Sequence, residues 1–326
     1  MGLFRAIAAA FVAAFPLVAL AAPEFPPGVW SDGGDYSIDD FDGKVLVLVF
    51  YDDGCSKCAA STEEYAKLQE AFEDEPVYVF AVAVNDSETS AAQYAKTNGM
   101  GVPVFVDNAG LLTAAYGLDI PHDGNRKFMV VRPDGSIRNC GFMPNHATDH
   151  VGELAEDVAT MFDFSDVPEI FVPVLRDIEI GKWGRALRTA EPGLRSPDDA
   201  VREATERLFV TAEEQADVLL AEAAEANDAG DALAAMLKYE TVVEEFSVFP
   251  DRVTAARKAA RPLQKHPDVQ KEMAARERYA MLTNGLRQAT PQQADDVRAF
   301  ARKLVTEFPD TPTAKRVEGW LKVADD

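Results

Sequence analysis

The sequence predicts an α/β domain followed by an all-helical domain, and three observations support this fold class. Apolar runs typical of buried strands alternate with helical patterns between residues 45 and 142. Beyond about residue 165 the pattern is helical and rich in alanine. The 326 residues are 47% hydrophobic, which is enough for two cores of ordinary size. We expect an α/β domain at 22–164 and a helical domain at 165–326, after a cleaved segment at 1–21.

The N-terminal segment has the pattern of a secretory signal peptide. Arg5 precedes an apolar stretch that runs to Leu20, and Ala19 and Ala21 form the A-x-A pattern of a cleavage site. A membrane anchor is the alternative, but the stretch is short for a span, contains Pro16 and has no basic residue after it. We therefore expect cleavage after Ala21, no stable membrane span, and a periplasmic or secreted protein in an oxidising compartment.

The charge of the chain restricts its partners. With 55 acidic and 32 basic residues the formal net charge is −23. Such a surface repels nucleic acid and anionic lipid, because binding to either depends on contacts with phosphate groups. Solubility in a saline or extracellular setting is the simplest interpretation of the charge, and no nucleic-acid partner is expected.

The α/β domain is predicted to contain a parallel pair of central strands, followed by a hairpin. VLVLVF and VYVFAVAV are apolar on both faces, which suits central strands, and a right-handed crossover would make them parallel. The residues RPDG form a turn between the two strands of the hairpin. The expected strands are 45–50, 77–84, 127–131 and 136–142, and the expected helices are 58–72, 89–98 and 151–162.

Two of the three cysteines form the motif CSKC directly after the first central strand. If a helix starts at or just after Cys55, its unpaired N–H groups and its dipole favour the thiolate, so Cys55 is the expected nucleophile. Cys58 lies one turn further and can resolve a mixed disulfide. Lys57 adds a positive charge, whereas Asp52 and Asp53 oppose it. This chemistry is carried by the two thiols alone, and no cofactor is expected.

Structural roles are the alternatives for the cysteines. A permanent disulfide within CSKC would close so small a loop that it would restrict the unfolded chain very little, which favours a reversible bond. Cys140 is the odd cysteine, and we expect it to be a small buried apolar residue. A free thiol that couples to a partner is the other possibility for it.

The order of these elements resembles the thioredoxin superfamily, and in particular TlpA/ResA-like thiol:disulfide oxidoreductases, which are related to peroxiredoxins. FYDDGCSKC is similar to the FWATWCPPC-type segment of that family, and VPVFVDNAGLLTAAYGL and FMVVRPDGSI resemble segments that TlpA-like proteins share with peroxiredoxins. The resemblance covers roughly residues 30–162. It implies a thioredoxin-like fold and an enzyme that acts on a protein disulfide substrate with an external thiol donor.

The chain also departs from that family. The place of the family's cis-proline reads Asn125-Arg126-Lys127, and Arg126 falls on the arginine that stabilises the nucleophilic thiolate in peroxiredoxins. The resemblance therefore implies a catalytic role for Arg126 beside Cys55, and an ordinary exposed basic residue is the alternative. The peroxiredoxin motif P-x-x-x-T-x-x-C is absent, so an antioxidant peroxidase is the lesser possibility. Val49 replaces the buried acid of thioredoxin proper.

A copper or zinc carrier is a further alternative. Cys55 and Cys58 could combine with His146 and His150, which have the H-x3-H spacing of zinc ligands. His122 stands roughly where the Sco proteins, a copper-handling thioredoxin-like family, keep a histidine, but their CxxxC spacing is absent. We favour the redox pair, with no bound metal, and expect His146 and His150 at the solvated start of the last helix of the α/β domain.

The second half is predicted to be helical throughout. GKWGRAL resembles GDALAAM, and an FPD triplet followed by a helix occurs twice, at Phe249 and Phe308, which resembles tetratricopeptide (TPR) repeats. A plain helical bundle is the alternative. We find no catalytic constellation here and expect a partner-binding or dimerisation role. The expected helices are 200–227, 232–246, 253–263, 269–286, 292–307 and 313–324.

Overall fold

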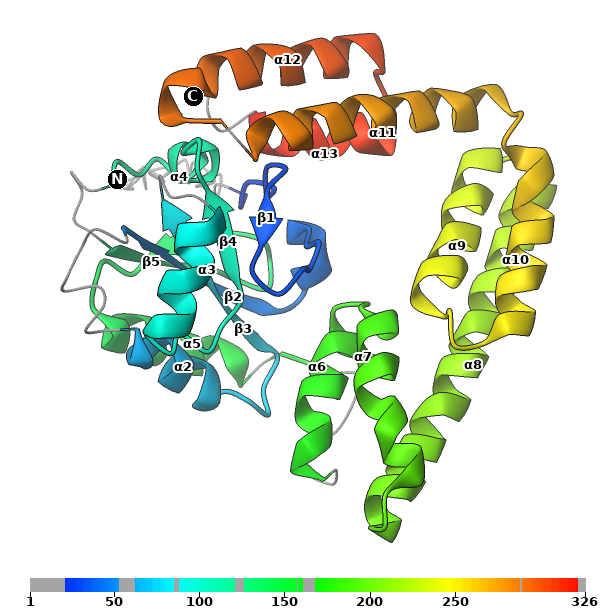
Figure 1. Cartoon of the computed structure of the whole chain (residues 1–326), viewed down its shortest axis with the longest axis horizontal. Helices are drawn as coiled ribbons and strands as arrows, with labels where there is room; N and C mark the ends of the chain where they lie inside the picture. The colour runs from blue at the N-terminus through cyan, green and yellow to red at the C-terminus, as the bar shows by residue number, and fades with distance from the viewer. Residues whose placement is uncertain are drawn as a thin grey trace, which may run out of the picture.

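The computed structural model describes residues 21–52, 62–84, 88–120, 126–156, 158–160, 168–287 and 289–321. A sheet with helices on its faces forms the first half of the chain, and the second half is a series of helices that curves around one side of it (Figure 1). This arrangement confirms the predicted fold class. Within the described ranges, no helix combines the length and the apolar character needed to cross a membrane.

The sheet has six strands in the order β1-β4-β3-β2-β5-β6. β2 and β3 lie at its centre and are parallel, β4 is parallel to β3, and β5 is antiparallel to β2. The outer strands β1 and β6 are antiparallel to their neighbours. The strands are β1 (Val29–Trp30), β2 (Val45–Tyr51), β3 (Val77–Val84), β4 (Val104–Asp107), β5 (Arg126–Val131) and β6 (Ile137–Asn139).

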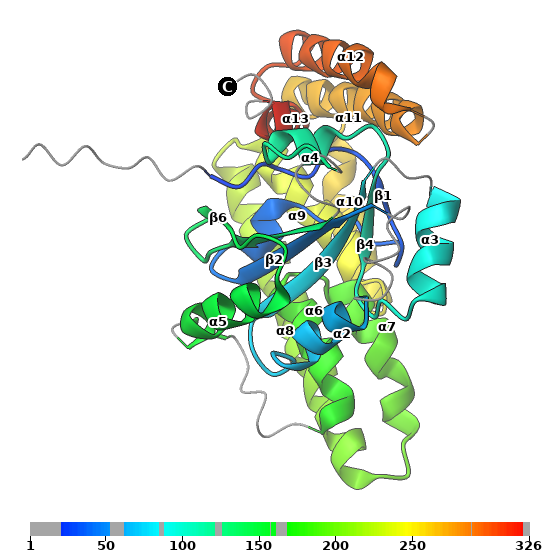
Figure 2. The same cartoon turned by 90° about the vertical axis from the view of Figure 1, so that its left-hand side faces the viewer.

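Both faces of the central strands are buried, as their unbroken apolar sequence predicts. Side chains of β2 alternate between two cores. Val47 and Val49 belong to the core under α2 (Glu63–Glu70) and α5 (Pro144–Ala155). Leu46 and Leu48 belong to the core formed with α4 (Leu111–Ala115) and with aromatic residues of the N-terminal segment, which also contains the short helix η1 (Ile38–Phe41). Figure 2 shows α2 and α5 on one face of the sheet and α4 on the other.

Three elements of this half differ in their boundaries from the sequence-based expectation. The helix expected at 151–162 begins at Pro144 and ends at Ala155. Proline suits the first turn of a helix, and Ala147, His150 and Val151 form the buried stripe of α5, although the polar run PNHATDH gives little apolar signal. The strand expected at 136–142 covers only Ile137–Asn139. The helix expected at 58–72 is α2, which covers Glu63–Glu70, and residues 58–61 lie outside the described residues. The helix expected at 89–98 is confirmed as α3 (Glu88–Thr97).

The helical half follows the predicted pattern closely, with two additional helices at its start. Helices α8 to α10 pack side by side, as do α11 to α13 (Figure 1). Whether these units are TPR repeats stays a prediction. The elements are η3 (Glu169–Phe171), α6 (Val172–Glu179), α7 (Trp183–Ala190), η4 (Glu191–Arg195), α8 (Asp199–Asp228), α9 (Ala232–Glu245), α10 (Pro250–Leu263), α11 (Pro267–Leu286), η5 (Pro291–Gln293), α12 (Ala294–Glu307) and α13 (Pro312–Leu321).

The two halves share an apolar core. Ala109 and Leu111, at the start of α4, pack in one cluster with Leu282 and Leu286 of α11 and Trp320 of α13. The start of α4 therefore packs into an apolar cluster of the helical half that is separate from the two cores of the sheet. The proposed domain boundary near residue 165 lies largely outside the described residues and stays a prediction.

Candidate functional site

Cys55 and Cys58 lie within residues 53–61, outside the described residues. The candidate site is therefore defined by the elements that flank this segment. β2 ends at Tyr51, and α2 begins at Glu63. The segment that contains CSKC thus connects the carboxyl end of a central strand to the amino end of a helix, which is the order of elements expected from the sequence.

The described residues on both sides of the CSKC segment are well packed. The ring of Tyr51 is buried and stacks on Tyr94 of α3, with 5.2 Å between the ring centroids. On the other side, the Thr62 hydroxyl donates to the carbonyl oxygen of Asn98 at 2.7 Å, which joins the start of α2 to the end of α3. The CSKC segment therefore begins and ends at well-packed positions.

Arg126 lies at the same end of the sheet. It is the first residue of β5 and is paired with Tyr51 in the antiparallel register of β2 and β5. Its Nη1 donates to Oε2 of Glu64 at 3.0 Å, and its guanidinium lies 5.9 Å from the ring centroid of Phe128. The Arg126 side chain is only 18% exposed, against 44% for Glu64. Arg126 is thus a largely buried cation beside the end of β2, and its partner Glu64 was not found from the sequence.

An exposed apolar pair lies beside the start of β5. The Phe128 N–H donates to the Gly141 carbonyl at 2.7 Å, which brings the next two residues close to Arg126 and Lys127. Those residues, Phe142 and Met143, are 53% and 48% exposed, and Lys127 Nζ lies 5.6 Å from the Phe142 ring centroid. Large apolar side chains that are exposed next to a candidate site are typical of a surface that binds another molecule.

The segment VPVFVDNAGLLTAAYGL has a structural role that the structure makes clear. The buried carboxylate of Asp107 accepts hydrogen bonds from the N–H groups of Leu112 (3.2 Å) and Thr113 (2.8 Å) and from the Thr113 hydroxyl (2.7 Å). Burial raises the pKa of Asp107, and these hydrogen bonds oppose the rise. Gly110 has a φ of 66° at the start of α4, which glycine adopts without strain. Asp107 therefore caps α4 and is not placed as a reactive group.

The histidines do not behave alike. His146 is exposed, as expected, but His150 is buried, which corrects the expectation of a solvated side chain. His150 Nδ1 lies 2.9 Å from Arg138 Nη1 and accepts its hydrogen bond, since arginine can only donate. Burial and the Arg138 charge lower the pKa of His150. His122 lies outside the described residues, and the described part of the chain contains no group of three or more His, Cys, Asp or Glu that could hold a metal ion.

Cys140 is buried, which confirms the expectation for the odd cysteine. Its N–H donates to the Phe128 carbonyl at 2.8 Å, and its side chain lies in the core under α5. Burial raises the pKa of the Cys140 thiol, so this thiol is both covered and weakly acidic.

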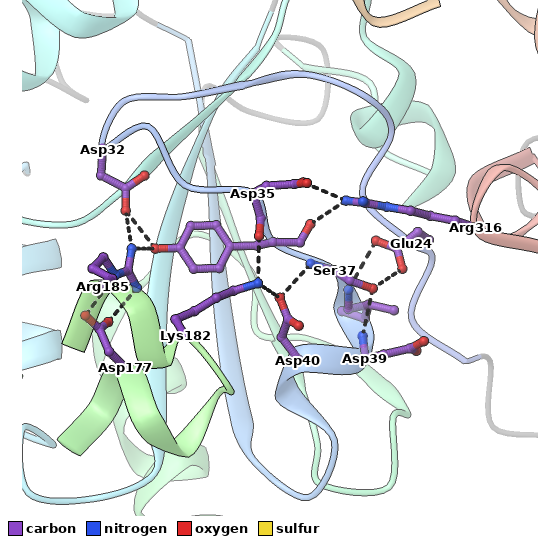
Figure 3. Close-up of polar contacts among 12 residues, drawn as sticks. Glu24, Asp32, Asp35, Ser37, Asp39, Asp40, Asp177, Lys182, Arg185 and Arg316 are labelled. Atoms are coloured by element: carbon purple, nitrogen blue, oxygen red, sulfur yellow. Dashed lines mark hydrogen bonds and ion pairs between the residues drawn. The ribbon is translucent and has the colours of Figure 1, made fainter. Parts of the chain in front are cut away.

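A charged contact joins the helical half to the loop at residues 32–40 (Figure 3). Arg185 of α7 binds the carboxylate of Asp177 through two nitrogens and also donates to Asp32 Oδ2 at 3.0 Å and to the Tyr36 hydroxyl. The Tyr36 hydroxyl donates to Asp32 at 2.7 Å, and burial raises the pKa of Tyr36 above its usual range. Arg316 of α13 reaches the same loop, where it donates to Asp35 Oδ1 at 2.9 Å.

A third cation, Lys182 directly before α7, completes this charged contact. Lys182 Nζ lies 2.9 Å from Asp40 Oδ2 and 2.8 Å from the Asp35 carbonyl oxygen. Because the cations of this contact are engaged by acceptors of the loop, we interpret the contact as structural. The sequence analysis missed it, since its partners are separated by more than 100 residues and no local pattern connects them.

The sheet order and the position of CSKC after the central strand define the first half as a thioredoxin-like domain. Residues 18–140 match the AhpC/TSA family. A curated relative, the thiol-disulfide oxidoreductase ResA of Geobacillus thermodenitrificans, is 26% identical over 103 residues, which are 31% of this chain and 58% of ResA. The match thus spans little more than half the length of that relative.

Two solved structures are similar to part of this chain. The thioredoxin domain of the thiol-disulfide oxidoreductase BVU-2223 from Bacteroides vulgatus is 20% identical and aligns with 42% of this chain and 96% of its own, with a TM-score of 0.37. A putative thiol:disulfide interchange protein DsbE from Chlorobium tepidum is 22% identical and aligns with 41% of this chain and 92% of its own, with a TM-score of 0.34.

Proposed function

We propose that this protein is a periplasmic or secreted thiol:disulfide oxidoreductase that uses Cys55 and Cys58. The observation that carries the proposal is the position of CSKC: it follows the buried central strand β2 and precedes α2 in a thioredoxin-like sheet. The AhpC/TSA match and the name of the curated relative support the same class of reaction. The signal-peptide pattern before Ala22 supports the location.

The proposed reaction is a pair of thiol–disulfide exchanges. The Cys55 thiolate attacks one sulfur of a substrate disulfide, and the other sulfur leaves as a thiolate, so that a mixed disulfide forms. The Cys58 thiolate then attacks the Cys55 sulfur, which releases the second substrate thiol and leaves a Cys55–Cys58 disulfide. An external thiol donor returns this disulfide to two thiols. The substrate is reduced by two electrons, which the donor finally supplies.

Arg126 is proposed to stabilise the Cys55 thiolate by its positive charge. Its ion pair with Glu64 is relevant, because a carboxylate at 3.0 Å offsets part of that charge. We therefore expect Arg126→Ala to slow alkylation of Cys55 at a pH below the pKa of that thiol, and Glu64→Gln to accelerate it. The measurement is the pH dependence of the alkylation rate, followed by mass spectrometry of the Cys55 peptide. Equal profiles for the wild type and both variants would remove the electrostatic role of Arg126.

The exposed Phe142 and Met143 suit the docking of a polypeptide substrate next to Arg126. An apolar surface beside the reacting disulfide would favour partly unfolded proteins, whose apolar side chains are accessible. Partner binding by the helical half is a separate proposal that rests on its repeat-like sequence and its series of packed helices.

Trapping of mixed disulfides tests the proposed function. All variants carry Cys140→Ser, so that only the motif cysteines react. With Cys58→Ser we expect covalent complexes with substrate proteins that reducing agent releases, and with Cys55→Ser we expect none. Complexes formed equally by both variants would contradict the assigned order of the thiols. A wild-type protein that reduces neither a protein disulfide nor a peroxide, yet binds partners, would instead be a scaffold or metal carrier.

A further inference from the structure

A polar groove lies between α4 and the start of α12. Its cavity volume is about 380 Å³, within the range of ordinary ligand sites. One wall comes from the thioredoxin-like half and includes Val84, Asp119 and Ile120. The other wall comes from the helical half and includes Asp295 and Arg298 of α12. We call this the α4–α12 groove.

The α4–α12 groove lies at the candidate-site end of the sheet. Val84 is the last residue of β3, and Ala83 is paired with Tyr51 in the parallel register of β3 and β2. Val84 is therefore next to Asp52, from which the chain continues towards Cys55. Neighbouring strands are about 4.8 Å apart, so this groove opens one strand away from the point where the CSKC segment leaves β2.

Contacts around the groove hold its two walls together. Besides the shared apolar core, the Asn108 side-chain amide donates to the Leu286 carbonyl at 2.7 Å. α13 packs against α4, as Figure 2 shows, and a Cβ at Gly319 of α13 would lie 2.8 Å from the Glu24 Cβ. Such close packing leaves the walls little freedom to separate, so the groove is preformed and a ligand would not need to order it.

The charges in the groove define the ligand that it favours. Its charged lining residues are Asp119, Asp295 and Arg298, which together carry one net negative charge. Arg298 is paired with Asp295 at 3.0 Å, but Asp295 is 96% exposed, so water weakens this pair and the Asp295 carboxylate remains accessible to a ligand. The net charge of −23 adds attraction for a cation.

We propose that the α4–α12 groove binds the polypeptide chain that flanks the substrate disulfide, with a preference for a basic side chain, so that the helical half forms one wall of the substrate site. This inference rests on the proposed oxidoreductase function. It gives the helical half a role in substrate selection, because α12 brings Asp295 to the edge of the sheet from which the CSKC segment leaves. A small disulfide without flanking residues would not reach the groove.

Charge reversal at two neighbouring positions tests this proposal in the full-length protein. Asp295→Lys reverses the charge in the groove, and Asp296→Lys is the matched control, because it makes the same change in net charge on the side of α12 that faces α11. The substrates are two disulfide peptides that differ only in a lysine or a glutamate beside the disulfide, and hydroxyethyl disulfide. The readout is kcat/KM for each.

For Asp295→Lys we expect kcat/KM for the lysine peptide to fall about three- to tenfold relative to the glutamate peptide, since single exposed charges have modest effects and the reversal turns attraction into repulsion. The kcat/KM values of each variant are normalised to its activity on hydroxyethyl disulfide, and Asp296→Lys should change the peptide preference less than Asp295→Lys. If the variants still reduce hydroxyethyl disulfide, two results would overturn the proposal. One is an equal change in peptide preference in both variants, and the other is an unchanged peptide preference in Asp295→Lys. A wild-type protein that reduces no disulfide would instead contradict the proposed function on which it rests.

Discussion

Truncation of Arg176 to alanine should weaken the attachment of α6 to the thioredoxin-like half. The Arg176 guanidinium donates to the carbonyl oxygens of Phe72 (3.1 Å), Glu73 (3.1 Å), Glu75 (2.8 Å) and Val77. It also lies 4.6 Å from the ring centroid of Tyr78, whose hydroxyl donates to the Arg176 carbonyl at 2.9 Å. One side chain of the helical half thus donates hydrogen bonds to the carbonyl groups of the turn before β3 and of the first residue of β3.

The size of the effect follows from these contacts. Hydrogen bonds from a charged donor contribute about 1.5–3 kcal/mol each, and the cost of burying the guanidinium offsets much of their sum. Burial lowers the pKa of Arg176, which is the sign of that cost. We therefore expect Arg176→Ala to lower the free energy of unfolding by about 3 kcal/mol, because these carbonyl groups lose a charged donor and the Tyr78 ring loses the guanidinium that lies over it.

Urea unfolding followed by circular dichroism measures this change, and amide hydrogen exchange of residues 72–77 locates it. Arg176→Lys should recover less than half of the loss, since an ammonium group cannot reach carbonyl groups on both sides of the turn as a guanidinium does. The matched control is Arg188→Ala, an exposed arginine on α7, with an expected change below about 0.5 kcal/mol. A loss below about 1 kcal/mol for Arg176→Ala, equal to that of the control, would refute the reasoning.

Three further changes probe the fold around the site. Asp107→Ala should lower the free energy of unfolding by about 2–3 kcal/mol, because buried N–H groups of α4 lose their acceptor, and calorimetry showing an unchanged Tm would contradict this. Gly28→Ala should cost about 1–3 kcal/mol in urea unfolding, because its Cβ would lie 2.3 Å from the Phe105 ring; a neutral effect would show that the ring moves freely. The pKa of buried His150 is lowered in the folded protein. Below the ordinary histidine pKa of about 6.5, His150 therefore binds a proton in the unfolded chain more readily than in the folded chain. Stability should therefore fall as the pH drops from about 7 to 5, and this part of the dependence should disappear in His150→Gln; equal pH profiles would argue against it.

Part of the site could be predicted and part could not. The family resemblance pointed to Arg126, and the structure brings that residue to the end of β2. Its partner Glu64 lies 62 positions away in the sequence, and no local pattern connects the two residues. Phe142 is the last residue of the strand expected at 136–142, but β6 ends at Asn139 and the Phe142 side chain is exposed.

The sequence by itself determined the central strands, the hairpin and most helices of the second half. Each of these elements has a strong local signal: unbroken apolar runs for β2 and β3, a Pro-Asp-Gly turn before β6, and helical periodicity from α8 onwards. Such signals depend on neighbours within a few residues, and they survive without knowledge of the rest of the chain. The CSKC motif is also a local signal, and its interpretation as a redox pair depends mainly on its position between a strand and a helix.

Only the tertiary structure decided how the halves are joined. The acidic loop at 32–40 meets Arg185 and Arg316 from opposite ends of the helical half, and Arg176 serves carbonyl groups about 100 residues earlier in the chain. The groove between α4 and α12 likewise exists only because Leu111 and Leu286 share one core. These contacts join side chains that are far apart in the sequence. Charge and burial act through space, so such contacts produce no periodic pattern in the sequence.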